Sequence, residues 1–175
     1  MKTTRLWIAL AALVSTPAVA NTASGNAMLD LVTCQGAVLL TQSMNGDEEA
    51  TERVKAMESL FADLRNKEIF VPSGTASVYL TPAEPMTVAD ANLDSFGPAG
   101  FGIFKGPSVV LDGSFEEVKA TLSAEHAVDY GNCKSNGQLK VCSRELAPGL
   151  SRLLMSHPGQ PTRQAVLICV EGVER

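Results

Sequence analysis

The sequence predicts an α+β fold in which one long and one short amphipathic helix pack on antiparallel β-sheet. Residues 47–66 have apolar side chains at helical spacing, and residues 114–117 (Ser-Phe-Glu-Glu) form a helix-capping box. Residues 135–138 place Asn-Gly between two strand-like runs, which is the strongest short signal for a β-hairpin. The order helix, strands, helix, strands is also the order that two related α-then-β halves would give, although the halves cannot be aligned residue by residue.

The first residues carry the three parts of a secretory signal peptide in order. Lys2 and Arg5 form a positive n-region, a short apolar stretch follows, and residues 18–20 (Ala-Val-Ala) match the pattern that signal peptidase cleaves. The apolar stretch is shorter than the ~20 residues that a membrane-spanning helix needs. We therefore expect residues 1–20 to be a signal peptide and residues 21–175 to be a single domain that is periplasmic or secreted.

Composition and charge narrow the function classes. Apolar residues make up 45% of the chain and charged residues 19%, which is ordinary for a globular protein and excludes wholesale disorder. The formal net charge of −5 becomes −7 when Lys2 and Arg5 leave with the signal peptide. Nucleic-acid binding needs clustered Lys and Arg, which this sequence lacks, so we expect no nucleic-acid partner. We also expect no transmembrane segment after signal cleavage, and an acidic protein favours basic partners.

The elements after the expected cleavage site follow in order along the chain. Residues 21–26 are small and polar, and we expect them to be loose. Residues 27–43 suit a helix or a strand, and helix is the favoured interpretation. Residues 47–66 are the clearest helix, because apolar side chains recur on one face at Ala50, Val54, Met57, Phe61 and Leu64. Glu49 and Arg53 add a favourable i,i+4 pair to that helix.

Short strands and one more helix are expected in the middle of the chain. Runs rich in β-forming residues cover residues 76–80, 86–88, 100–104 and 108–111. Residues 90–94 begin like a calcium loop but lack its glycine and its closing glutamate, so we interpret them as a polar turn. The capping box then starts a short helix that ends near His126.

The last third of the chain predicts an antiparallel meander. Asn136-Gly137 is the expected two-residue turn of its first hairpin. Residues 150–156 and 163–170 are two further strands, joined by the proline-containing residues 157–162.

Four cysteines in an exported chain allow three disulfide pairings. Cys133 and Cys142 flank the expected hairpin, where a turn at residues 136–137 leaves them one diagonal step apart and a slightly longer loop brings the sulfurs together. Cys34 and Cys169 then pair by elimination. A redox pair or a zinc site are the alternatives, but the sequence has neither C-x-x-C nor closely spaced zinc ligands. Structural disulfides are the favoured interpretation.

Catalytic motifs are absent from the sequence. His126 and His157 are its two histidines, and no nucleotide-binding, serine-hydrolase or zinc-protease pattern is present. We therefore expect no catalytic residue, no metal ligand and no cofactor, and we favour a protein that is not an enzyme.

Two loops are candidate binding sites. Residues 96–104 mix phenylalanine with glycine, which suits an apolar docking loop or, as the favoured interpretation, a bulged strand. Residues 157–162 form a proline-stiffened loop that loses little entropy on binding. The candidate binding residues are Phe96, Phe101, Phe104, His157 and Gln160.

These features predict a non-enzymatic binding protein of the cell envelope, an inhibitor or immunity-type partner of another exported protein, with a basic partner favoured by charge. One alternative is an accessory or structural component of an envelope assembly. Another is an enzyme with an unrecognised site, which would require His126 or His157 to meet a buried carboxylate and a hydroxyl in a pocket.

The exported protein is expected to begin at Asn21, because cleavage follows the Ala-Val-Ala pattern of residues 18–20. Intact-mass measurement on protein recovered from the exporting cell checks this. A mass that still includes Trp7 would contradict it.

Overall fold

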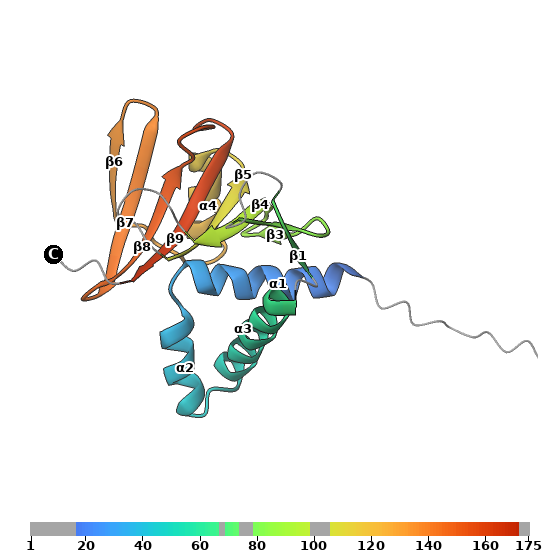
Figure 1. The fold of residues 1–175 in the computed structure, drawn as a ribbon. Coiled ribbons are helices and arrows are strands. Elements are labelled where there is room, and N and C mark those ends of the chain that lie inside the picture. The colour runs from blue at the N-terminus through green and yellow to red at the C-terminus, as the bar shows by residue number, and fades with distance from the viewer. Residues whose placement is uncertain (1–16, 67–68, 74–78, 99–105, 172–175) are drawn as a thin grey trace, which may run out of the picture.

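The structure is a computed structural model that describes residues 17–66, 69–73, 79–98 and 106–171 (Figure 1). It has the α+β fold with antiparallel sheet that the sequence predicts. The helices in these ranges are α1 (Pro17–Val32), α2 (Gly36–Met44), α3 (Glu48–Asn66) and α4 (Phe115–Ala124). The strands are β1 (Phe70–Pro72), β2 (Leu80–Pro82), β3 (Thr87–Val88), β4 (Ala91–Pro98), β5 (Pro107–Asp112), β6 (Asn132–Asn136), β7 (Leu139–Ala147), β8 (Leu150–Ser156) and β9 (Gln164–Glu171). Within the described ranges, no helix combines the length and apolarity needed to cross a membrane.

The sheet joins two antiparallel meanders through their last strands. Its order is β1-β2-β4-β5-β9-β8-β7-β6, and β3 pairs with β4 beside this path. Strands β5 and β9 pair from Ser108 opposite Ile168 to Asp112 opposite Gln164. Helix α3 precedes the first meander and α4 precedes the second. The topology therefore has the two α-then-β halves that the order of elements suggests.

Both faces of the central strands are buried. On one face, strand side chains such as Val109 and Leu167 pack with α1 and α4 in the main core. On the other face a second apolar cluster contains Val110, Leu153, Met155, Val166, Ile168 and Val170. Burial on both faces explains why residues 165–170 are a continuous apolar run in the sequence rather than an alternating one.

Helix α1 lies between the sheet and α3 (Figure 1). It extends over residues 21–26, so the expectation that these residues are loose is wrong. Gly25 lets the helix approach β3 closely: a Cβ added there would collide with the carbonyl oxygen of Thr87. The adjacent Ala27 and Met28 are fully buried. Tertiary packing thus stabilises a helix that local preference alone does not favour.

A break after α1 separates it from the α2–α3 hairpin. Cys34 has a positive φ of 61°, which ends the helical path, so the helix interpretation of residues 27–43 is right for most but not all of the range. Helix α3 matches the expected helix, and the carboxylate of Asp47 accepts a hydrogen bond from the Ala50 amide at 3.0 Å. Helix α3 packs mainly on α1 and α2. The contact between α1 and the sheet is therefore larger than that between α3 and the sheet.

The hairpin of β3 and β4 corrects the interpretation of residues 90–94 as a polar turn. The turn is at Ala89 and Asp90, which have φ values of 49° and 57°, and β4 starts directly afterwards. Leu93 of β4 is buried in the main core, which outweighs the turn-forming preference of its polar neighbours. The strand that we expect at residues 100–104 lies outside the described residues.

Helix α4 begins with the predicted capping box. The Ser114 hydroxyl accepts from the Glu117 amide at 3.3 Å, and the Ser114 amide donates to the Glu117 carboxylate at 2.8 Å. These hydrogen bonds lower the pKa of Glu117, because they favour its charged form.

The hairpin of β6 and β7 has a different turn from the expected one. Asn136 pairs with Leu139, so the turn residues are Gly137 and Gln138, with Gly137 at a φ of 61°. This register places Cys133 directly opposite Cys142, and the two form a disulfide.

The second disulfide joins Cys34 to Cys169, so both pairings are those inferred from the sequence. Cys34 follows α1 and Cys169 lies in β9. Their Cα atoms are 5.2 Å apart, and the bond fixes the end of α1 against the centre of the sheet.

Gly25→Ala is expected to lower the free energy of unfolding by ~1–3 kcal/mol, because the added methyl meets the Thr87 carbonyl. Alanine alone would favour the helix by about 1 kcal/mol, so the sign of the change reports the close approach. Urea unfolding measures it, with Ser24→Ala as the matched control on the same helix. A more stable Gly25→Ala protein would contradict the contact between α1 and β3.

Candidate functional site

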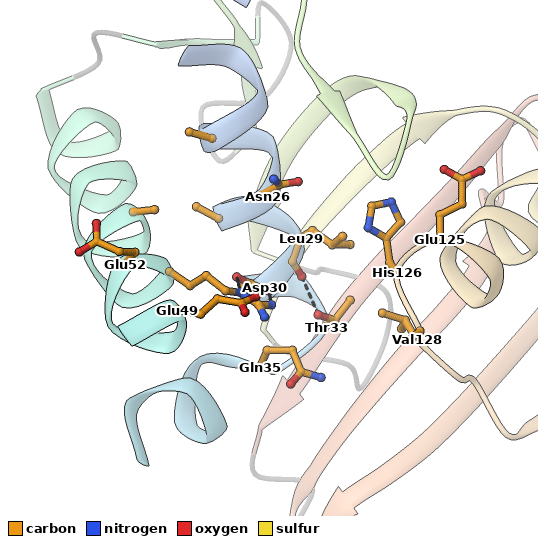
Figure 2. Close-up of a pocket in the computed structure, with 15 residues that line it drawn as sticks. Asn26, Leu29, Asp30, Thr33, Gln35, Glu49, Glu52, Glu125, His126 and Val128 are labelled. Atoms are coloured by element: carbon orange, nitrogen blue, oxygen red, sulfur yellow. Dashed lines mark hydrogen bonds and ion pairs between the residues drawn. The ribbon is translucent and has the colours of Figure 1, made fainter. Parts of the chain in front are cut away.

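A groove of about 840 Å³ lies between α1, α3 and the segment that follows α4 (Figure 2). Helix α1 supplies Asp30, the turn directly after it supplies Thr33, and α3 supplies Glu49 and Arg53. On the other side of α1, His126 faces the groove from the segment after α4. The groove therefore exists only where three separate parts of the chain meet.

An ion pair between α1 and α3 lies in this groove. The side chain of Asp30 is 7% exposed and that of Arg53 is 44% exposed. Arg53 Nε donates to Asp30 Oδ2 at 3.1 Å, and a second guanidinium nitrogen donates to Oδ1. The hydrogen bond with Asp30 raises the pKa of Arg53, and the charges of Asp30 and Glu49 raise it further. The sequence suggests Glu49 as the partner of Arg53, but the guanidinium binds the carboxylate on the neighbouring helix.

The polar groups around His126 do not form an acid–base site. Its Nε2 atom lies 3.5 Å from Asp90 Oδ2, on a carboxylate that is 67% exposed. That geometry gives no hydrogen bond, and Nε2 is buried without a hydrogen-bond partner among the described residues. The Thr33 hydroxyl, directly after the end of α1, donates to the Leu29 carbonyl of that helix at 2.7 Å. The buried carboxylate and hydroxyl that the enzyme hypothesis requires are therefore not assembled on His126 in the described part of the chain.

The groove is lined by more acidic than basic side chains. Asp30 is matched by Arg53, and Glu52 is matched by Lys55 at 2.7 Å. Glu49 and Glu125 also line the groove, and neither forms an ion pair within the described residues. The described residues also contain no cluster of three His, Cys, Asp or Glu side chains that could hold a metal ion. A cationic group of another molecule is the natural complement of such a surface.

The residues predicted to bind are placed in two different environments. Phe96 of β4 is half-buried against the main core, with its ring centroid 6.0 Å from that of Phe70. His157 Nδ1 accepts a hydrogen bond from the backbone N–H of Gly159 at 3.1 Å. The backbone N–H of the exposed Gln160 donates to the His157 carbonyl at 3.1 Å. These bonds shape the connection between β8 and β9. The remaining two candidates, Phe101 and Phe104, lie outside the described residues.

The two predicted loops start from opposite ends of the strands. The connection between β4 and β5 leaves from Pro98, which pairs with Pro107 next to Ser108. The connection between β8 and β9 leaves from Ser156, which pairs with Ala165 at the other end of β9. They therefore start at separate places on the sheet, and none of their described residues lines the groove.

Sequence reasoning missed the groove residues. Asp30 is a lone acid between apolar residues of a helix, and such a residue is seldom buried unless it has a partner. That signal predicts that the Asp30 carboxylate pairs with a cation in the folded protein. It does not identify Arg53, because the choice of partner depends on how α1 and α3 pack.

Comparison with protein-family models, curated proteins and solved structures found no significant match.

Arg53→Met is expected to lower the free energy of unfolding by ~1–3 kcal/mol, because it leaves the Asp30 carboxylate buried without its cation. Lys55→Met is the matched control, since it removes an exposed lysine from the same helix and breaks only the surface pair with Glu52. Denaturant midpoints of the two variants are compared. Equal midpoints would show that the ion pair across α1 and α3 does not stabilise the fold.

Proposed function

We propose that this protein is a non-enzymatic binding protein of the periplasm or of the secreted fraction, an inhibitor or immunity-type partner of another exported protein. The observation that carries the proposal is the pair of carboxylates, Glu49 and Glu125, which form no ion pair among the described residues and line the groove from two sides of α1. A basic segment of the partner lies along the groove and contacts both carboxylates.

The negative net charge of the protein favours binding to a basic partner. The chain has a net charge of −5, which steers basic partners towards it over long range. Inside the groove, an incoming Lys or Arg gains from Glu49 and Glu125 without displacing an existing ion pair, since none has to break. The already formed pair of Asp30 and Arg53 holds the two helices in place and spares the partner the cost of ordering them.

The disulfides agree with an exported location. Disulfides persist in oxidising compartments and are rare where thiols are kept reduced. Two of them, together with the signal-like residues 1–20, support the periplasm or the cell exterior as the place where the protein acts.

One observation favours a second candidate function, that of an accessory component in an envelope assembly. Helix α2 has Ala37, Leu40 and Met44 at helical spacing, and Leu40 and Met44 are 50% and 72% exposed. Exposed apolar stripes of this kind are usually covered by another protein. A permanent complex that covers α2 and leaves the groove open would favour this alternative.

The groove variant Glu49→Gln/Glu125→Gln is expected to bind the partner ~10-fold more weakly than the unchanged protein, because both carboxylate attractions are lost. The matched control is Glu84→Gln/Glu145→Gln, which removes the same total charge from exposed positions outside the groove. Partners are captured from the native envelope at two salt concentrations, and binding to the purified partner is then titrated. Equal affinity of the two double variants would contradict the groove as the binding site.

A further inference from the structure

The two disulfides differ in their access to solvent. Cys34 and Cys169 are both buried, at 5% and 3% exposure. In the other bond Cys142 is fully buried, but Cys133 belongs to the edge strand β6, whose five residues are all exposed. A thiol from solution can therefore approach the Cys133–Cys142 bond only from the side of Cys133.

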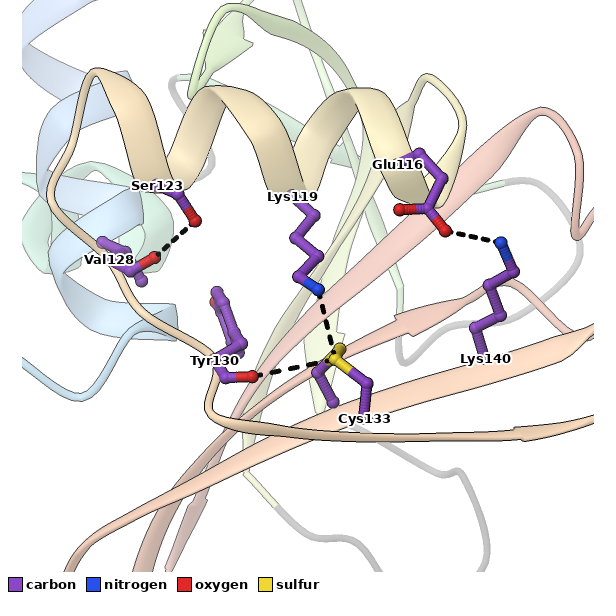
Figure 3. The surroundings of a disulfide bond; sticks show 8 residues. Glu116, Lys119, Ser123, Val128, Tyr130, Cys133 and Lys140 are labelled. Carbon is purple, nitrogen blue, oxygen red and sulfur yellow. Dashed lines mark hydrogen bonds and ion pairs between the residues drawn. A yellow bond between two sulfur atoms is a disulfide. The ribbon is translucent and has the colours of Figure 1, made fainter.

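A lysine lies against the sulfur of Cys133. Lys119 extends from α4 and places its Nζ atom 3.3 Å from Cys133 Sγ (Figure 3). The neighbouring Lys140 is paired with Glu116, so its charge is already matched, and that pairing lowers the pKa of Glu116. The Lys119 ammonium is thus aimed at the sulfur, where it stabilises negative charge.

We propose that Cys133 is a site of thiol–disulfide exchange, modified by anionic low-molecular-weight thiols. The incoming thiolate attacks Cys133 Sγ and forms a new sulfur–sulfur bond. The Cys133–Cys142 bond breaks, its electron pair goes to Cys142 Sγ, and that sulfur takes up a proton. A second thiolate then releases Cys133 as a thiol, so that two thiols are oxidised to one disulfide while the protein gains two electrons.

Lys119 assists the first step of this exchange. Negative charge is spread over three sulfur atoms when the thiolate attacks, and the central one is the sulfur that Lys119 contacts. The ammonium both attracts the anionic thiol and stabilises that charge. Cys34–Cys169 has no exposed sulfur-bearing residue, so it stays closed under the same conditions.

Exchange at Cys133 also releases the edge of the sheet. Strand β6 pairs only with β7 in the sheet path, and none of its residues is buried. The disulfide is therefore its one covalent link to a buried position, Cys142. The modified protein keeps its core and gains a loosened edge strand, which shows as faster amide exchange in β6.

The test treats the folded, oxidised protein with 2-mercaptoethanesulfonate, an anionic thiol, without denaturant. Acid quenching and peptide mapping should find the thiol on Cys133, a free thiol at Cys142 and an intact Cys34–Cys169 bond. Lys119→Met should slow the reaction ~3–10-fold, whereas Lys134→Met, which removes an exposed lysine next to Cys133, should leave it unchanged.

A second measurement needs no variant. Cysteamine is a cationic thiol of similar size, and each rate is divided by the rate of the same thiol with a short disulfide peptide. The normalised rate should favour the anionic thiol, because Lys119 repels the cationic one. Equal reduction of both disulfides, an adduct on Cys142, or rates that ignore thiol charge and Lys119→Met would each overturn the proposal.

Discussion

Helix α1 is buried on two sides, and the arrangement of the helices depends on that burial. Met28 and Val32 are fully buried in the core between the sheet and the helices. Gly25 lets the helix backbone approach β3, Asp30 binds the guanidinium of α3, and Cys34 joins the end of the helix to β9. Each contact fixes a different point along one helix, so α1 has a single position on the sheet. The groove and the placing of α3 follow from that position.

Elements with strong local signals were predictable from the sequence, and elements held by tertiary contacts were not. The capping box at Ser114 and the apolar stripe of α3 are local, because neighbouring residues determine them. Residues 21–26 and 91–94 have no such signal, yet they form part of α1 and β4. In both cases burial against a distant part of the chain, at Gly25 and at Leu93, outweighs local preference.

The candidate site was harder to predict than the fold. Asp30 and Arg53 are 23 residues apart and meet only because α1 crosses α3, and the periodicity of either helix contains no information on that crossing. The sequence instead drew attention to Phe96 and His157, which stand out by composition. In the fold one packs on the core and the other shapes a turn. The residues with unusual sequence surroundings therefore have local structural roles. The charged groove is formed by residues whose sequence surroundings are ordinary.

The nested disulfides have a consequence for the order of folding. A chain that emerges from its N-terminus presents Cys34 first, then Cys133 and Cys142, and Cys169 last. Pairing in order of appearance would join Cys34 to Cys133 and trap a non-native loop. The native partner of Cys34 arrives only with β9, so that bond forms late or by exchange from a wrong one, on a timescale of seconds to hours. The packing of α1 on the completed sheet is what brings Cys34 next to its native partner in β9.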